Sequence, residues 1–375
     1  MPDLKVLIVD DTVVYRQILT RVLSGFDGIE VTGAAPNGRI ALNKVELNPP
    51  DMVLLDVFMP EMDGLETLKV LKDRFPAVDV VMLSGMDHET AGLTMRALEA
   101  GALDFIPKPR TGGSAESMTE LRAVLGRLIP VVRSHKYVRE VRRLSRETPG
   151  RRSVSPDLSP EPEPIPLAIR TNPAPPAAPP NVVAIGVSTG GPNALQEIIP
   201  RLAADFPVPI LAVQHMPPMF TATLAARLDS ISNLRVKEGA DGEIPKPGVM
   251  YIAPGGRHMV ARRAADGTAV LGLTDAPPVN SCRPSVDVLL RSVGMTYGGR
   301  VLTVILTGMG SDGMAGATAL SRQGAYVIIQ DRDTSVVWGM PGAVAGTGRA
   351  NEILPLGRIA DRISRLASRS RHDSR

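Results

Sequence analysis

This sequence has little cysteine, only a small excess of positive charge and no long hydrophobic runs. Its 375 residues contain a single cysteine, Cys282, which excludes an intrachain disulfide and a cysteine-rich metal site. No uncharged stretch approaches the roughly 20 residues that span a bilayer, so we expect no membrane insertion. The start, Met1-Pro2-Asp3-Leu4, leads directly into an apolar run and lacks the order of a signal peptide. We therefore expect a cytoplasmic protein.

The net charge is small for a chain of this length. It is +3, with 43% hydrophobic and 22% charged residues, a composition that favours two or three globular domains. Arginines gather over residues 133–152 and 358–375, where solvated helix faces and a linker account for them better than a nucleic-acid site does. Nothing after residue 181 resembles a helix-turn-helix. We expect no nucleic-acid partner, and a DNA-binding output is the weakest alternative.

Two α/β domains are predicted from the order of apolar runs and amphipathic stretches. Residues 1–125 repeat strand and helix five times, which predicts a five-stranded parallel, flavodoxin-like sheet covered on both faces. A helix extension and a proline-rich linker follow over residues 126–180. Strand–helix alternation resumes over 181–358 as a second doubly wound domain, with a β-hairpin insert around Asp266-Gly267. A basic helix and tail are expected over 359–375.

Polar side chains follow successive strands of the first predicted sheet. Asp10 and Asp11 end the first strand, Asp56 the third and Ser84 the fourth, and Lys108 follows the fifth. Because the carboxyl ends of parallel strands meet at one edge, the three carboxylates should converge, and a hard cation such as Mg²⁺ relieves their repulsion. A carboxylate beside Mg²⁺, with a lysine and a hydroxyl nearby, can accept a phosphoryl group.

These strand ends closely resemble the pattern of a response-regulator receiver domain. The resemblance covers residues 1–125 and includes Val9-Asp10-Asp11, Leu55-Asp56, Met59-Pro60, Met62-Asp63-Gly64, Ser84 and Lys108-Pro109. Asp63 and Asp51 match no catalytic position of that pattern. We interpret Asp51 as a residue at the start of a strand.

The receiver resemblance implies a role for each matching residue. Asp56 takes a phosphoryl group from a histidine kinase, while Asp10 and Asp11, together with Asp56, hold Mg²⁺. Ser84 and Phe105 form the switch pair. Lys108 is the partner of the phosphate.

Glycines surround Ser188 at a predicted turn between strand and helix. The apolar run Val182–Ile185 precedes Gly186-Val187-Ser188-Thr189-Gly190-Gly191, and Pro192 begins a helical pattern. Such a turn exposes a hydroxyl, and the backbone N–H groups of the coming helix favour an oxyanion. Ser188 is therefore a candidate nucleophile. A phosphate-binding loop or a plain tight turn is the simpler alternative.

A serine nucleophile needs a base, and the sequence has five histidines. His215 directly follows the predicted strand at residues 210–214, so it should lie at the same sheet edge as Ser188. His258, near the predicted hairpin, is the alternative base. A buried structural histidine is the simpler interpretation of either residue.

The orienting acid should lie at that edge too. Asp312 follows the predicted strand at residues 301–306 through a glycine-rich turn, and Asp331 and Asp333 are the competing acids. The order Ser, His, Asp along the chain differs from the order Ser, Asp, His of α/β-hydrolases. The α/β-hydrolase fold is therefore excluded, but a Ser-His-Asp mechanism is not, because such triads are defined by geometry rather than by chain order. Cys282 is a rival nucleophile, although no glycine turn surrounds it.

Five segments of the second half look like the chemotaxis protein-glutamate methylesterase (CheB) family. They are Gly186–Gly191, Gln214–Pro217, Ala253–Gly255, Ser281–Asp287 and Thr307–Gly313. The resemblance spans residues 182 to about 350. Joined to a receiver by a linker, the whole chain is similar to a methylesterase response regulator.

This second resemblance implies a mechanism and its partners. Ser188 is the nucleophile, His215 the general base and then acid, and Asp312 holds the imidazole. Backbone N–H groups near Met309 and Thr189 support the oxyanion. The implied reaction needs no cofactor and hydrolyses glutamate γ-methyl esters on the cytoplasmic region of a chemoreceptor, releasing methanol.

Two further points concern activity and control. Attack on a primary amide by the same groups makes glutamine deamidation a second activity. In the family, the unphosphorylated receiver covers the esterase edge and phosphorylation by a chemotaxis histidine kinase relieves the block. A non-enzymatic response regulator, whose second domain only binds a partner, is the alternative from another class.

Overall fold

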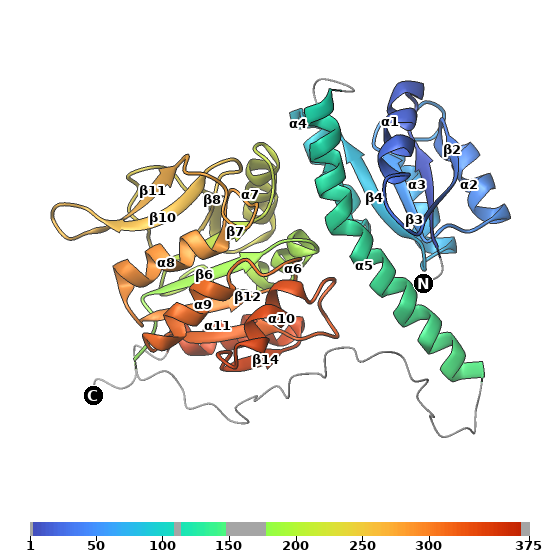
Figure 1. Cartoon of the computed structure of the whole chain (residues 1–375). Coiled ribbons are helices and arrows are strands. Elements are labelled where there is room, and N and C mark those ends of the chain that lie inside the picture. The colour runs from blue at the N-terminus through green and yellow to red at the C-terminus, as the bar shows by residue number, and fades with distance from the viewer. Residues whose placement is uncertain (1–2, 109–113, 148–177, 369–375) are drawn as a thin grey trace. The chain divides into compact units, whose positions relative to one another are not determined.

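The computed structural model describes residues 3–108, 114–147 and 178–368 (Figure 1). The chain divides into two compact units, residues 1–161 and 162–375, and each is described by itself. None of the helices in the described ranges is long and apolar enough to cross a membrane.

The first unit is built on a five-stranded parallel sheet with the order β2-β1-β3-β4-β5. Its central strands are buried on both faces, which is the pattern of a parallel sheet covered by helices. The predicted flavodoxin-like class is confirmed. The strands are β1 (Leu4–Val9), β2 (Ile29–Ala35), β3 (Met52–Asp56), β4 (Asp79–Ser84) and β5 (Asp104–Pro107), and the helices are α1 (Val13–Leu23), α2 (Gly38–Leu47), α3 (Gly64–Arg74), α4 (His88–Glu99) and α5 (Ala115–Glu147).

Asp63, which matches no catalytic position in the sequence, caps α3. Its carboxylate accepts from the backbone N–H of Glu66 at 2.7 Å, and the Glu66 side chain accepts from the N–H of Asp63 at 3.2 Å. This reciprocal pair is a capping box. Asp63 therefore fixes the start of a helix.

Helix α5 is continuous over 33 residues, so the expected boundary at residue 125 falls inside it. Its second half is tied to acids at the starts of strands β3 and β4. Lys136 lies 2.9 Å from Asp51, and His135 and Arg139 lie 3.1 and 3.3 Å from Asp79. Because these ion pairs hold the basic part of α5 against the sheet, the first unit extends beyond residue 125.

The second unit contains a seven-stranded sheet with the order β14-β13-β12-β6-β7-β9-β8, in which every pairing is parallel. The predicted hairpin is confirmed as the antiparallel pair of β10 (His258–Arg263) and β11 (Ala269–Thr274). The sequence did not indicate the edge strands β8 (Arg235–Glu238) and β14 (Glu352–Leu354), because both are short and carry charged residues.

The remaining elements of the second unit complete its two helical layers. The strands are β6 (Val182–Val187), β7 (Ile210–Gln214), β9 (Val249–Ile252), β12 (Val301–Ile305) and β13 (Tyr326–Gln330). The helices are α6 (Gly191–Ile198), η1 (Ile199–Arg201), α7 (Phe220–Ile231), α8 (Val286–Tyr297), α9 (Met314–Arg322), α10 (Gly339–Gly346) and α11 (Leu356–Ser368).

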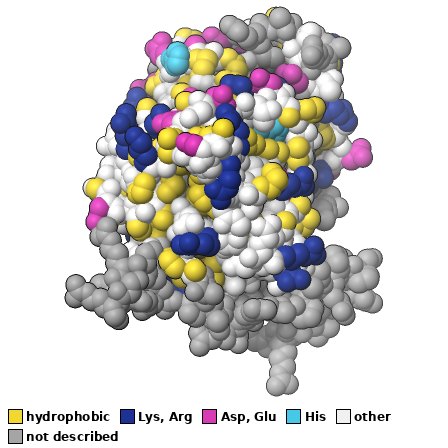
Figure 2. All heavy atoms as spheres, turned by 90° about the vertical axis from the view of Figure 1, so that its left-hand side faces the viewer, with side chains coloured by type: hydrophobic (Ala, Val, Ile, Leu, Met, Phe, Trp, Pro, Cys, Tyr) yellow, Lys and Arg dark blue, Asp and Glu magenta, His cyan; other side chains and the backbone are white. Residues whose placement is uncertain are grey.

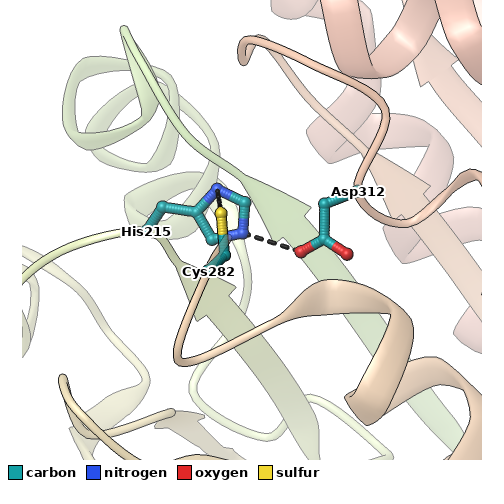
Figure 3. A group of neighbouring side chains, drawn as sticks. All are labelled: His215, Cys282 and Asp312. Atoms are coloured by element: carbon teal, nitrogen blue, oxygen red, sulfur yellow. Dashed lines mark hydrogen bonds and ion pairs between the residues drawn. The ribbon is translucent and has the colours of Figure 1, made fainter. Parts of the chain in front are cut away.

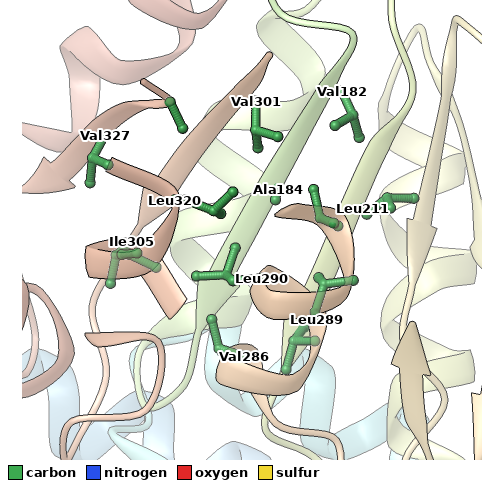
Figure 4. Packing of buried hydrophobic residues seen from close by; sticks show 14 of the residues in the cluster. Val182, Ala184, Leu211, Val286, Leu289, Leu290, Val301, Ile305, Leu320 and Val327 are labelled. Atoms are coloured by element: carbon green, nitrogen blue, oxygen red, sulfur yellow. The ribbon is translucent and has the colours of Figure 1, made fainter. Parts of the chain in front are cut away.

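Helix α8 packs on the sheet through the core of the second unit. Figure 4 shows Val286, Leu289 and Leu290 of α8 beside apolar side chains of β6 and its neighbours, and these residues are buried. A Cβ atom at Gly186 would lie 2.4 Å from the Val286 side chain, so only glycine lets the start of α8 approach β6 this closely. This contact fixes the N-terminus of α8 near the carboxyl edge of the sheet.

Candidate active site

Ser188 lies directly after β6, in the turn that leads to α6. The turn passes through Gly190, whose φ of 77° is left-handed and suits glycine. The backbone N–H of Ser188 donates to the carbonyl of Thr307 at 3.0 Å, which joins this turn to the end of β12. A Cβ atom at Gly308 would lie 2.7 Å from Cβ of Ser188, so a glycine there allows the two turns to pack together.

His215 and Asp312 meet at the same edge of the sheet. His215 follows β7, Asp312 comes after β12, and Nε2 of the histidine lies 2.8 Å from Oδ2 of the aspartate (Figure 3). The backbone N–H of His215 donates to the carbonyl of Val187, the residue before Ser188, at 3.2 Å. Among the residues that the structure describes, no hydrogen bond joins the Ser188 hydroxyl to His215.

Asp312 is 2% exposed and is surrounded by hydrogen-bond donors. The donors are His215 and the backbone N–H of Val286 on Oδ2, and Asn280, the Ser285 hydroxyl and the backbone N–H groups of Asp287 and Gly313 on Oδ1. Burial alone would raise the pKa of this carboxyl, but the interactions with His215, Asn280 and Val286 outweigh it and lower the pKa to about 2. Asp312 is therefore a permanent anion.

The charge of Asp312 acts on the imidazole of His215. Burial is the largest single influence and lowers the pKa of His215, but the interactions with Asp312 and Cys282 together outweigh it and raise the pKa above its ordinary value of 6.5. The pair thus stabilises an imidazolium, the form that a general base takes after it accepts a proton.

The competing histidine and acid lie elsewhere. His258 is fully buried, with Nε2 3.1 Å from the carbonyl of Pro277 and Nδ1 accepting from the N–H of Ser285 at 3.1 Å. Asp331 accepts from the backbone N–H and the hydroxyl of Thr334 and so closes a turn. Neither residue contacts His215.

Thr189 belongs to the turn that carries Ser188, and Met309 belongs to the turn after β12, which packs against it through Gly308. Met309 follows Gly308, and its backbone N–H has no acceptor within the described ranges. Thr189 is 8% exposed, and its carbonyl accepts from the Thr307 hydroxyl at 3.0 Å. An N–H without an acceptor beside Ser188 is what an oxyanion site requires.

The first unit brings its acids together at the carboxyl edge of its own sheet. Asp10 and Asp56 are buried, Asp11 is exposed, and one oxygen of each lies within 4.8 Å of the others. The Lys108 ammonium lies 2.7 Å from both Asp10 and Asp56. Burial raises the pKa of Asp56 to about 6, although Lys108 partly opposes this. Mg²⁺ binds oxygens at about 2.0–2.1 Å, so three carboxylates this close together fit the ion.

The expected switch residues are buried in the first unit. The Ser84 hydroxyl lies 2.6 Å from the hydroxyl of Thr94 on α4, and Phe105 is 7% exposed. The sequence did not single out Tyr15, whose ring centre lies 5.0 Å from the Lys108 ammonium and whose buried hydroxyl has no partner within the described residues. Tyr15 is an aromatic residue on α1, and the sequence pattern alone does not distinguish it from a residue of the hydrophobic core.

Models of two known protein families match this chain. A CheB methylesterase model matches residues 183–363, and a response regulator receiver domain model matches residues 6–118. A Desulfotalea psychrophila protein named protein-glutamate methylesterase/protein-glutamine glutaminase is 43% identical over 365 residues, which are 97% of this chain and 98% of that one. The chain belongs to the CheB methylesterase family.

Other members of the CheB family are similarly related. A Trichodesmium erythraeum protein of the same name is also 43% identical, covering 97% of this chain and 99% of its own. The crystal structure of the Thermotoga maritima CheB methylesterase catalytic domain is 46% identical and covers 50% of this chain and 100% of that domain, with a TM-score of 0.49.

Near the site of this CheB family member lie three residues that reasoning from the sequence missed or assigned another role. Gln214, 2% exposed, donates to the carbonyls of Ser188 and His215 at 3.0 and 3.3 Å. Sγ of Cys282, considered only as a rival nucleophile, lies 3.6 Å from Nδ1 of His215 (Figure 3). Asn280 contacts Asp312. Gln214 directly precedes the candidate base His215 in the sequence, and this was the one signal that could have pointed to it.

The surface of the CheB catalytic unit adds one observation about charge. On the face shown in Figure 2, lysine and arginine side chains form several separate groups among hydrophobic and uncharged atoms. A continuous basic stripe, the electrostatic pattern of nucleic-acid binding, does not appear among the described atoms of this face.

Proposed function

We propose that this chain is a cytoplasmic, phosphorylation-controlled protein-glutamate methylesterase with protein-glutamine glutaminase activity. It hydrolyses glutamate γ-methyl esters on the cytoplasmic region of chemoreceptors to glutamate and methanol, and glutamine amides to glutamate and ammonia. The contact between His215 and Asp312, next to Ser188 at one sheet edge, carries this proposal. Membership of the CheB methylesterase family supports it.

The first half of the reaction forms an acyl-enzyme. Nε2 of His215 donates to Asp312, so the lone pair lies on Nδ1, which takes the proton of the Ser188 hydroxyl as its oxygen attacks the ester carbonyl. The Met309 N–H, with Thr189 opposite, supports the oxyanion. His215 then returns the proton to the methoxide oxygen, and methanol leaves. Asp312 stabilises the imidazolium between these steps.

The second half releases glutamate. Water attacks the Ser188 ester, His215 takes a proton from the water and gives it to Oγ of Ser188, and the free carboxylate departs. An amide substrate follows the same course, with ammonia as the leaving group. No step needs a cofactor.

The receiver unit supplies the control. Asp10, Asp11 and Asp56 are the residues that would hold Mg²⁺, which when bound neutralises the charge of incoming phosphoryl oxygens. The Asp56 carboxylate accepts the phosphoryl group from a chemotaxis histidine kinase, and Lys108 pairs with it. Ser84 and Phe105 then change position as the switch pair, and the esterase activity of the second unit rises.

Release of methanol from methyl-labelled receptor tests the catalytic assignment. Ser188→Ala should lose the activity by at least about 10³-fold, because the nucleophile is removed. Ser230→Ala is the matched control, since that hydroxyl lies on the exposed side of α7 and bonds only to the Arg227 carbonyl. Methanol release by the Ser188 variant at the wild-type rate would refute the assignment. A wild-type protein that binds receptor without releasing methanol would favour the non-enzymatic response regulator.

A further inference from the structure

A strained turn next to the candidate active site holds Asn280. Val279 and Cys282 form an antiparallel bridge, with hydrogen bonds of 3.1 and 2.9 Å between their backbone groups. The two residues between them, Asn280 and Ser281, have φ values of 53° and 60°. Two successive left-handed residues are a conformation that glycine adopts most easily. Asparagine tolerates this conformation better than most residues, so the contacts of the Asn280 amide, rather than the turn, show what the side chain does.

The Asn280 amide bridges two buried carboxylates. Its nitrogen donates to Oδ1 of Asp312 at 2.9 Å and to Oδ2 of Asp287 at 3.0 Å, and these acids are 2% and 3% exposed. Within the described ranges, neither acid forms an ion pair with a lysine or an arginine. The two negative charges are therefore held by His215 and by neutral donors, of which Asn280 is the one shared by both acids.

Asn280 also controls which oxygen of Asp312 faces the base. Together with Ser285 and the N–H groups of Asp287 and Gly313, it anchors Oδ1, which leaves Oδ2 to His215 and the Val286 N–H. This arrangement keeps the imidazole proton on Nε2 and the lone pair on Nδ1, the nitrogen that must take the Ser188 proton. Without the amide, Oδ1 keeps the Ser285 hydroxyl and the N–H groups of Asp287 and Gly313, but it loses the one donor that it shares with Asp287, and its charge is less dispersed.

We propose that Asn280 is a positioning residue for the esterase reaction: it orients Asp312 and holds its charge apart from that of Asp287. The inference rests on the proposed function. Asn280 does not touch the substrate, and it acts through Asp312 on His215. Because Asn280 and Ser281 are exposed, substitutions there leave the buried core unchanged.

The groups that share this environment define the controls. The titratable side chains that face His215, Asp312 or the loop that holds them are Cys282, Asp287 and His258. Ser281→Gly is the matched control, because it relaxes the same turn and leaves the Asn280 amide in place. Asn280→Asp keeps the shape of the side chain and tolerates a left-handed backbone, but it removes the donor and adds a charge.

The experiment measures methanol release from methyl-labelled receptor as a function of pH, using full-length protein. Asn280→Ala and Asn280→Asp should lower kcat by about 10- to 100-fold with little change in KM, since a displaced catalytic group costs rate rather than binding. The acidic limb of the pH profile should move to higher pH, and further for Asn280→Asp, because more negative charge near the imidazolium raises the pKa of His215. Ser281→Gly should keep the wild-type profile.

Each outcome decides one question. If both Asn280 variants keep the wild-type kcat and acidic limb, or lose activity with the limb unmoved, the positioning role is wrong. If Ser281→Gly moves the limb as much as Asn280→Ala does, turn geometry rather than the amide is responsible, and the proposal again fails. If the wild-type protein releases no methanol at any pH, the proposed function itself fails, whatever the Asn280 variants do.

Discussion

Two acidic sites at two sheet edges have opposite electrostatics. In the receiver unit, burial raises the pKa of Asp56 to about 6, and only Lys108 opposes it strongly. In the catalytic unit, burial of Asp312 is outweighed by His215, Asn280 and the N–H groups around the start of α8, so its pKa falls to about 2. The difference comes from what surrounds each carboxylate, since both acids follow buried parallel strands.

The difference teaches what each site is built to do. The receiver acids repel one another and are incompletely neutralised, so they attract a cation, whose charge would in turn offset that of incoming phosphoryl oxygens. Asp312 has its full set of donors from within the protein and needs no incoming partner. One edge is arranged to change its charge state, and the other to keep it constant.

The largest effect is expected at Asp312, the acid whose charge stays constant. Asp312→Asn should lower the rate of methanol release by roughly 10⁴-fold, because the neutral amide no longer holds the imidazole in the right tautomer. Receiver phosphorylation should be unchanged. Asp331→Asn is the matched control, since that acid closes a turn away from His215. Equal rates for Asp312→Asn and wild type would remove the distinction between the two sites.

The next effect concerns the switching site. Asp56→Asn should abolish stimulation of the esterase by a phosphoryl donor, a loss of about tenfold or more if the active state is a minor population beforehand. Chelation of Mg²⁺ should have the same result, because both act before phosphoryl transfer. The fragment 181–375 should be more active than the unphosphorylated full-length protein and insensitive to both treatments. Equal rates of fragment and full-length protein would contradict inhibition by the receiver.

The two carboxylates should also differ in how pH affects stability. The folded-state pKa of Asp56 lies above its unfolded value of 3.8, so protonation favours the fold, and stability is gained as pH falls through about 6. Between pH 7 and pH 5, without divalent cations, the gain should be close to tenfold in the unfolding equilibrium. Hydrogen exchange of the β3 amides measures it, and Asp56→Asn should remove the dependence.

Asp312 has the opposite sign. Its folded-state pKa lies below 3.8, so its contribution to stability is present above that pH and is lost as pH falls through about 2. Amides of β12 should therefore show no loss of protection from Asp312 until the solution is strongly acidic. An earlier loss that disappears in Asp312→Asn would contradict the assignment.

The smallest effect is expected at Cys282. Cys282→Ala should keep methanol release within roughly a factor of five, because a thiol is a weak hydrogen-bond donor to Nδ1 of His215. Ser188→Ala measured in parallel should be inactive. A loss as large as that of Ser188→Ala would instead make the thiol essential and revive the rival nucleophile.

The residues that follow buried strands could be predicted from the sequence. The strands at residues 52–56 and 210–214 are short apolar runs, and the parallel topology brings their carboxyl ends to one edge, so Asp56 and His215 were found by position. The same logic selected Asp312. The short, charged edge strands β8 and β14 were missed because they lack a buried apolar pattern.

The contacts that set the pKa values and positions of the site residues could not be predicted from strand positions in the sequence. Cys282 and Asn280 lie on the same irregular turn. Cys282 comes 67 residues after His215, its partner, and Asn280 comes 32 residues before Asp312, so no periodicity relates either residue to the group it contacts. The roles of Asp63 in capping and of Gln214 in joining two turns depend on hydrogen bonds that form only in the folded chain.

By itself the sequence determined the two α/β domains, the acids of the receiver edge and the residues that follow strands β6, β7 and β12, because buried parallel strands and glycine turns are local patterns. Only the tertiary structure decided which partners each charged group has. The pKa of a buried carboxylate depends on every donor within a few ångströms, and those donors come from distant parts of the chain. For this reason burial raises the pKa of Asp56, whereas the donors around Asp312 lower the pKa of that acid.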